Sequence, residues 1–229
     1  MNEAHPNATT AAPQERIGRV AKRRQKNREA LLRAASTVMS KKGLDGATML
    51  EIAELADVGA GTVYNYFKSK DELAIAVLED MMHSLALRIE ATTKGFTDPA
   101  QVYAFGIRTV LEVATNDVRW KQLLSRSEVI ADALFRRMGP FAIRDMRLAA
   151  DAGRFKIPNA ELVWRLTSSA IVGVALAITS DAAPADAVDQ VIVRLLGMTG
   201  IDADAALELA MRPRPALSEI SDEGGGVAD

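Results

Sequence analysis

The residues best suited to chemistry lie in one short stretch, residues 48–70, where hydroxyls, an amide and a lysine alternate with apolar residues. Thr48 precedes Glu51 by three residues, which is the spacing of a capping box at a helix start. Ser69 and Glu72 repeat that spacing at a later helix start. The stretch therefore predicts two short helices joined by a tight turn at residues 56–59, which is the helix-turn-helix pattern.

The second of these helices would enter the major groove of DNA with its N-terminal residues first. Ala60 and Gly61 are small enough for close approach to the sugar-phosphate wall. The hydroxyls of Tyr64 and Tyr66 are suited to donate to phosphate, and Asn65 is suited to read a base edge. The alternative for the two tyrosines is a purely packing role.

Cations surround this stretch. Lys70 and the free N–H groups at its helix start form a predicted anion site, although a solvated lysine is the ordinary alternative. Arg19, Lys22, Arg23, Arg24 and Lys26 precede the predicted first helix, either as a DNA-contacting arm or as a solvated tail. The candidate DNA-binding residues are Arg23, Arg24, Thr48, Ala60, Gly61, Thr62, Tyr64, Asn65, Tyr66 and Lys70.

The stretch Thr48–Leu73 resembles the DNA-binding domain of the TetR family of bacterial transcriptional regulators. The matching residues follow the family's spacing without a gap: Thr48, Ile52-Ala53, Ala56, Val58, Gly61-Thr62-Val63-Tyr64, Tyr66-Phe67, Lys70 and Leu73. Asp57 departs from the family's usual glycine and Gly59 from its usual serine. The resemblance implies a DNA-binding regulator, most often a repressor, whose twofold dimer reads a palindrome.

The distribution of charge supports a DNA-binding end. Residues 1–70 hold 12 of the 28 basic and 7 of the 30 acidic residues, whereas the remainder holds 16 and 23. The first part thus carries +5 and the second −7, which together give the net charge of −2. A basic head on an acidic body is typical of a DNA-binding domain attached to another domain.

Several functional classes are disfavoured. The chain has no cysteine and only two histidines, so no metal site or cofactor is predicted, and no nucleophile-elbow pattern supports an enzyme. Residues 1–14 lack the apolar segment of a signal peptide, and the longest apolar run, residues 170–178, is too short to span a membrane. We therefore expect a cytoplasmic protein without a membrane partner.

The remaining sequence predicts an all-α fold. We expect a disordered arm (1–18), a DNA-binding domain (19–70), a helical effector and dimerisation domain (71–212) and a disordered acidic tail (213–229). Gly139-Pro140 is expected to break the chain between two helices. The predicted helices, besides those of the DNA-reading stretch, are 26–42, 70–92, 98–115, 119–124, 128–137, 141–152, 160–179 and 184–198. The strongly apolar pair 160–179 and 184–198 predicts a homodimer interface, and the alternative is intrachain core.

The resemblance also implies a small-molecule cavity between the long helix from Lys70 and the helices after it. Ligand would shift that long helix and lower operator affinity. An apolar or aromatic effector is predicted, because the candidates are mainly apolar, although helical core residues look the same. The candidate ligand-binding residues are Met81, Leu85, Tyr103, Phe105, Arg108, Trp120, Phe135, Met138 and Trp164. The competing hypothesis is a DNA-bound protein-interaction factor with no small effector.

Overall fold

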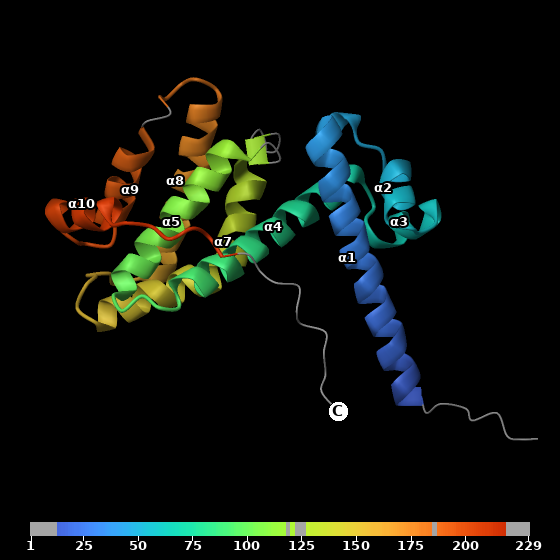
Figure 1. Ribbon diagram of the computed structural model, residues 1–229, viewed down its shortest axis with the longest axis horizontal. Helices are drawn as coiled ribbons and strands as arrows, with labels where there is room; N and C mark the ends of the chain where they lie inside the picture. Colours follow the sequence, from blue (N-terminus) through green and yellow to red (C-terminus); the bar gives the residue numbers. More distant parts are fainter. Residues whose placement is uncertain (1–12, 118–119, 122–126, 185–186, 219–229) are drawn as a thin grey trace, which may run out of the picture. The chain divides into compact units, whose positions relative to one another are not determined.

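The computed structural model describes residues 13–117, 120–121, 127–184 and 187–218. Within those ranges every regular element is an α-helix, so the predicted all-α fold is confirmed (Figure 1). Close contacts divide the chain into two compact units, one ending at Ala74 and one beginning at Ile75.

The first unit consists of α1 (Pro13–Gly46), α2 (Met49–Leu55), α3 (Ala60–Tyr66) and the start of α4 (Lys70–Thr93). α2 packs against both α1 and α3. The core of this unit is apolar and almost fully buried: Leu31, Ala35, Ile52, Val63 and Phe67 are at most 3% exposed. Burial of this small cluster fixes the angle between the two helices of the helix-turn-helix.

α1 begins earlier than predicted. Its first described residue is Pro13, so the basic segment around Arg23 and Arg24 is helical, and the prediction of disorder is wrong for residues 13–18. Arginine, lysine, glutamine and alanine are good helix formers, and they extend a helix that the packed residues after Arg28 have already nucleated. Gly43 has φ 76° and ψ 169°, which interrupts the helix directly after the predicted end at residue 42.

The second unit contains the rest of α4 together with α5 (Pro99–Asn116), α7 (Ser127–Asp151), α8 (Ala160–Thr179), α9 (Val188–Gly197) and α10 (Ala203–Met211). α5, α7 and α8 approach one another most closely and surround the core. Asp98, followed by Pro99, caps the N-terminus of α5, and Asn159 caps that of α8. The predicted helix 119–124 lies mostly outside the described residues, with only Trp120 and Lys121 seen to be helical.

The predicted break at Gly139-Pro140 is wrong, because α7 continues through it as one helix. Proline removes one backbone N–H from the helix. On the turn before it, the indole Nε1 of Trp164 donates to the carbonyl oxygen of Phe135 at 3.1 Å. A Cβ on Gly139 would lie 3.2 Å from the same indole nitrogen. The glycine therefore serves close packing of α7 on α8.

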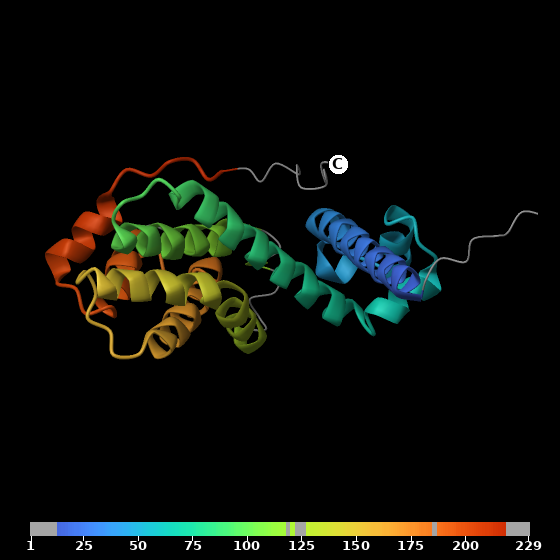
Figure 2. The same cartoon turned by 90° about the horizontal axis from the view of Figure 1, so that it is seen from below.

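The chain after α10 also differs from the prediction of a disordered tail. Residues 213–218 are extended, and Leu217 and Ser218 are half-buried. They run from α10 along α5 to α4, as Figure 2 shows. Residues 219–229 lie outside the described part of the chain. α10 itself was not predicted, although Asp202 caps its first turn in the expected way.

Candidate DNA interface and effector cavity

The N-terminus of α2 is built by a complete capping box. The Thr48 hydroxyl accepts from the Glu51 N–H at 3.2 Å, and the Glu51 carboxylate accepts from the Thr48 N–H at 3.3 Å. The same carboxylate pairs with Lys42 and accepts from the Thr48 hydroxyl, and these contacts, Lys42 first, hold the pKa of Glu51 below its usual range. Thr48 is thus exposed but already bonded, so a phosphate would share its hydroxyl with Glu51.

α3 presents the predicted DNA-reading residues on its outer face. Val63 is the buried residue of this helix, and Phe67 follows it into the core. Ala60, Gly61 and Asn65 are exposed, Tyr64 is 57% exposed, and Thr62 and Tyr66 are half-buried at the edge of this face. A Cβ at Gly61 would meet nothing within 4 Å, so its smallness is not required by the chain's own packing. The face is free to approach DNA.

The turn between α2 and α3 explains one departure from the family pattern. Asp57 has φ 54°, a left-handed conformation that glycine adopts freely and aspartate tolerates better than most residues. The backbone conformation at this position therefore favours glycine. Aspartate can adopt the same conformation at some cost in free energy. Gly59 is the N-cap of α3 and provides no side-chain hydrogen bond to it.

Lys70 begins α4, where the capping side chains are Ser69 and Glu72. Ser69 Oγ accepts from the Glu72 N–H at 3.1 Å, and Glu72 accepts from the Lys68 N–H at 2.7 Å. The Lys70 ammonium is half-buried and donates to the Asp45 carbonyl at the end of α1, at 3.0 Å. An ammonium has three donors, so this contact positions the cation and leaves it able to meet a phosphate.

The basic part of α1 extends beyond the residues that α2 and α3 cover (Figure 1). Lys22, Arg23, Arg24 and Lys26 are exposed, and none of them forms an ion pair with a described residue. From Arg28 onward α1 packs against the rest of its unit, and the Arg28 guanidinium lies 5.7 Å from the centre of the Phe67 ring. The predicted arm is therefore a helix carrying uncompensated cations.

The second unit contains a small, mainly apolar cavity of about 30 Å³ between α4, α5, α7 and α8. Three of the predicted ligand-binding residues, Tyr103, Met138 and Trp164, line it. The other lining residues are Ala86, Ile89, Val102, Gly106, Ile107, Val110, Phe141, Ala142 and Asp145. We call this space the effector cavity.

Asp145 is the feature of this cavity that the sequence analysis missed. Its side chain is only 12% exposed, and burial raises the pKa of its carboxyl even though the neighbouring Arg144 opposes that shift. Arg144 donates to Asp145 Oδ1 at 2.9 and 3.0 Å and to Glu90 at 2.6 Å. No described residue donates to Oδ2. Asp145 is thus the charged residue among the mainly apolar and aromatic side chains that line the cavity.

A second polar pair includes Tyr103, whose side chain lines the cavity. The hydroxyl groups of Tyr103 and Thr167 are 3.2 Å apart, and both side chains are buried. Burial raises the pKa of Tyr103 well above its usual value, against the smaller effect of the hydrogen bond, so its hydroxyl is neutral. The Tyr103 ring packs edge-on against Phe155, which holds its orientation.

The remaining ligand candidates lie elsewhere. Leu85 is buried and Met81 half-buried, and neither lines the effector cavity. Arg108 faces the other side of α5, where it bonds Asp189, Glu112 and the Ala210 carbonyl. Phe135 lies under Arg165, whose guanidinium is 3.5 Å from the ring centre. Trp120 is fully buried, and its indole N–H has no hydrogen-bond partner among the described residues.

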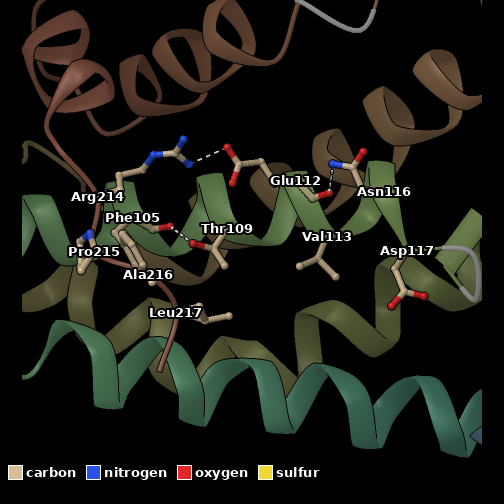
Figure 3. Close-up of a pocket in the computed structure, with 10 residues that line it drawn as sticks. All are labelled: Phe105, Thr109, Glu112, Val113, Asn116, Asp117, Arg214, Pro215, Ala216 and Leu217. Carbon is tan, nitrogen blue, oxygen red and sulfur yellow. Dashed lines mark hydrogen bonds and ion pairs between the residues drawn. The ribbon is translucent and has the colours of Figure 1, made fainter. Parts of the chain in front are cut away.

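A larger space lies on the outer face of α5. This groove of about 850 Å³ is lined by Phe105, another ligand candidate, and by residues 214–217 of the C-terminal segment (Figure 3). It is open to solvent and has no buried charged group, so size alone does not make it the effector site. The effector cavity with Asp145 has the better chemistry for selective binding.

Two family models match the chain. Residues 31–77 match the model described as bacterial regulatory proteins, tetR family, and residues 98–212 match the tetracyclin repressor-like C-terminal domain. Among solved structures, RolR in complex with its ligand resorcinol is 31% identical with a TM-score of 0.76, covering 86% of this chain and 100% of RolR.

Curated relatives match over shorter lengths. An uncharacterized HTH-type transcriptional regulator of Haemophilus influenzae is 41% identical over 64 residues, which are 28% of this chain and 32% of that protein. The HTH-type transcriptional repressor KstR of Mycobacterium tuberculosis is 25% identical over 144 residues, 58% of this chain and 66% of KstR. The chain therefore spans about a third of the first relative and about two thirds of the second.

Proposed function

We propose that this chain, which belongs to the TetR family of bacterial transcriptional regulators, is a dimeric repressor released from its operator by a small hydroxylated aromatic compound. Membership of the family makes the chain a DNA-binding regulator and not an enzyme. The proposal concerns the finer points: repression, the dimer, the effector and the DNA contacts. It also places the protein in the cytoplasm, where operator DNA lies.

Asp145 carries the effector proposal. A carboxylate among apolar and aromatic lining residues, with no described donor on its Oδ2, suits an apolar ring with a hydroxyl that donates a hydrogen bond. Such a buried acceptor also discriminates against rings without a hydroxyl, since its own desolvation would then be uncompensated. RolR, whose whole chain matches 86% of this one, binds resorcinol, a ring with two hydroxyls. We therefore expect a phenol or a dihydroxybenzene.

The size of the effector cavity suggests how binding produces a response. About 30 Å³ is far too small for an aromatic ring, because benzene occupies an engineered protein cavity of roughly 150 Å³. An effector must therefore displace a wall. α4 supplies Ala86 and Ile89 to the cavity and makes few close backbone contacts with the other helices. Because α4 continues from Lys70, its displacement would move the DNA-reading unit.

Operator release then follows from linkage. The effector must bind the displaced arrangement of α4 more tightly than the arrangement that fits DNA. A coupling free energy of about 1–3 kcal/mol would lower operator affinity roughly 5–150-fold. The proposed DNA contacts are phosphates for Arg23, Arg24, Thr48, Tyr64, Tyr66 and Lys70, and a base edge for Asn65, with Ala60, Gly61 and Thr62 against the groove wall.

α8 supports the dimer. Leu162, Leu166 and Leu176 are 56%, 51% and 37% exposed, and they lie on one stripe with the exposed Ser169 and Gly173. Their spacing alternates between four and three residues, which is the seam of helices packed in a bundle. The stripe would pack against its twofold copy, with α9 beside it.

α8 is also long and apolar enough, by length and composition, to cross a membrane, with a third of its apolar window buried. One such helix is weak evidence for a membrane span. Its first two turns carry Glu161 and Arg165, and its buried face packs on α5 and α7. Exposed leucines on one face only are better explained by a partner helix.

The proposal is tested by two measurements on the purified full chain. Selection of bound DNA from a random pool at 150 mM salt should return a palindrome with half-sites about one helical turn apart, or a multiple of it. Calorimetric titration with resorcinol, phenol and benzene should show binding of the hydroxylated rings only, and the bound ring should release the selected DNA. Binding of benzene as tightly as resorcinol would contradict the role of Asp145. Palindrome binding without a response to any ring would favour the protein-interaction alternative.

A further inference from the structure

The C-terminal segment is attached at three places along its path. At its root, the Arg212 guanidinium donates to Asp98 at 2.8 Å and to Gln101 at 3.0 Å. In the middle, Arg214 pairs with Glu112 of α5 (Figure 3). At its end, the backbone of Ser218 is held twice by α4: its N–H donates to Thr92 Oγ1 at 2.8 Å, and its carbonyl accepts from Arg88 Nε at 2.9 Å.

These attachments differ in strength. Arg214 and Glu112 are each 37% exposed, and a pair this open to solvent contributes little. Arg88 and Thr92 are half-buried and occur four residues apart, so they form one site on one face of α4. The end of the segment is therefore its specific contact, and that contact is with α4.

The segment is also stiff. Pro213 and Pro215 fix their own φ angles and keep the preceding residues, Arg212 and Arg214, extended. A proline-rich extended segment behaves as a semi-rigid spacer and not as a flexible tether. Since its root at Arg212 is fixed, the segment transmits a restraint from α10 and α5 to α4. It lies outside both family-model matches, the second of which ends at residue 212.

The site on α4 lies directly behind the effector cavity. Ile89, between Arg88 and Thr92 in the sequence, is 7% exposed and lines the cavity opposite Gly106. α4 makes few close backbone contacts with other helices. Its buried side chains and the ion pairs of Glu79 and Glu90 with arginines of α7 hold it in its unit. Moving Ile89 away from Gly106 to admit a ring would pull Arg88 and Thr92 away from Ser218.

We propose that residues 213–218 are a latch that keeps α4 in the closed-cavity position and so opposes effector binding. The inference that the latch opposes an effector rests on the proposed function, whereas its restraint on α4 does not. The closed cavity and the docked segment occur together in this structure, as the latch requires. Release of the segment removes contacts from the closed position alone, which shifts the population towards the open one.

Hydrogen exchange tests the restraint without any ligand. We would compare the full chain, a chain ending at Ser218, a chain ending at Arg212, and the variants Thr92→Val and Thr93→Val. The chain ending at Ser218 keeps the latch and is the control for truncation.

Thr93 bonds Ile89 O and not the segment, so Thr93→Val is the matched control for Thr92→Val. Amides of residues 85–93 should exchange about tenfold faster in the chain ending at Arg212, and should also be faster in Thr92→Val than in its control. Equal exchange in all latched and unlatched forms would overturn the latch.

Titration of the same proteins with resorcinol tests the regulatory consequence. We expect binding about 5–10-fold tighter in the chain ending at Arg212 than in the chain ending at Ser218. Equal resorcinol affinity in both chains would leave the effector proposal standing and reject the latch as a control on it. Absence of binding to every form would reject resorcinol as effector, while the exchange measurement would still decide whether the segment restrains α4.

Discussion

Asp57 separates two effects that usually coincide at one residue, backbone conformation and charge. Its φ of 54° is costly for most side chains, and its carboxylate lies in the turn next to the proposed DNA face. Asp57→Gly and Asp57→Asn both remove the charge and keep a residue that accepts this conformation. Asp57→Ala removes the charge and strains the backbone.

We expect all three substitutions to raise affinity for any DNA about two- to threefold at low salt, because one repulsive charge is lost. Only Asp57→Ala should unfold more easily, by about 1 kcal/mol relative to Asp57→Gly. Fluorescence anisotropy on specific and random duplexes, together with urea unfolding, measures both. An affinity gain confined to the glycine variant would show that the backbone, and not the charge, limits binding.

Asp145 predicts a stability that depends on pH. Burial raises the pKa of its carboxyl in the folded protein above the unfolded value near 4. The folded protein then holds this proton when the unfolded chain has lost it, so stability falls as pH rises from about 4 through the folded pKa. Below about pH 4 the carboxyl is protonated in both states, so the free-energy cost of ionising it in the folded protein is absent. Above the folded pKa this cost is fully present.

The variant Asp145→Asn lacks this cost. We expect the free energy of unfolding of Asp145→Asn, measured by urea at several pH values, to rise relative to that of the parent protein as pH rises from 4 to 7. Other carboxyls titrate in both proteins and cancel in the difference. The same variant should lose resorcinol binding at pH 7. A stability difference that is independent of pH would mean that the carboxyl is ionised in the folded state with an ordinary pKa.

At the scale of single helices, Gly139 lies within the continuous helix α7 and allows it to pack closely against Trp164 of α8. A Cβ there would lie 3.2 Å from Nε1 and 3.3 Å from Cδ1 of Trp164, a residue that is 1% exposed and hydrogen-bonded to Phe135 O. We expect Gly139→Ala to lower the free energy of unfolding by about 1–3 kcal/mol, as overpacking does.

Gly106→Ala is the matched control, since it also lies within a helix and its Cβ would meet Ile89 at an ordinary 3.8 Å. Alanine is the better helix former by about 1 kcal/mol, so this variant should be neutral or more stable. It should also weaken resorcinol binding, because its methyl group enters the effector cavity. If both variants gain stability in urea unfolding, α7 does not depend on close approach at Gly139.

The limits of prediction from sequence are clearest in these elements. Capping boxes depend on near neighbours in the chain, and both were predicted. The path of α7 depends on Trp164, which is distant in the sequence and which no local pattern connects to Gly139-Pro140. Because the predicted break separated Met138 from Phe141, the helical spacing that leads on to Asp145 was not followed. The contacts of the C-terminal segment with Arg88 and Thr92 join residues over 100 positions apart, so no local pattern predicts that it docks on α4.

For the whole molecule, the decisive unknown is the partner of α8. If its leucine stripe is the seam of a dimer, Leu166→Lys places a buried charge at the centre of that seam, next to its own twofold copy. The cost of burying unpaired charge is several kcal/mol, enough to separate the subunits at micromolar concentration. Leu87→Lys, on α4 and 38% exposed, changes an exposed leucine in the same way away from the stripe.

Sedimentation of the two variants and the parent protein should show a monomer only for Leu166→Lys. That monomer should keep its helical circular dichroism, because Leu166 is 51% exposed within one chain and its loss leaves the core intact. Its operator affinity should fall by several orders of magnitude, towards that of a single half-site, since the second half-site is no longer held at high effective concentration. A Leu166→Lys protein that remains dimeric would place the interface elsewhere, and the exposed Leu207 and Met211 beside the groove between α9 and α10 would be the next surface to test.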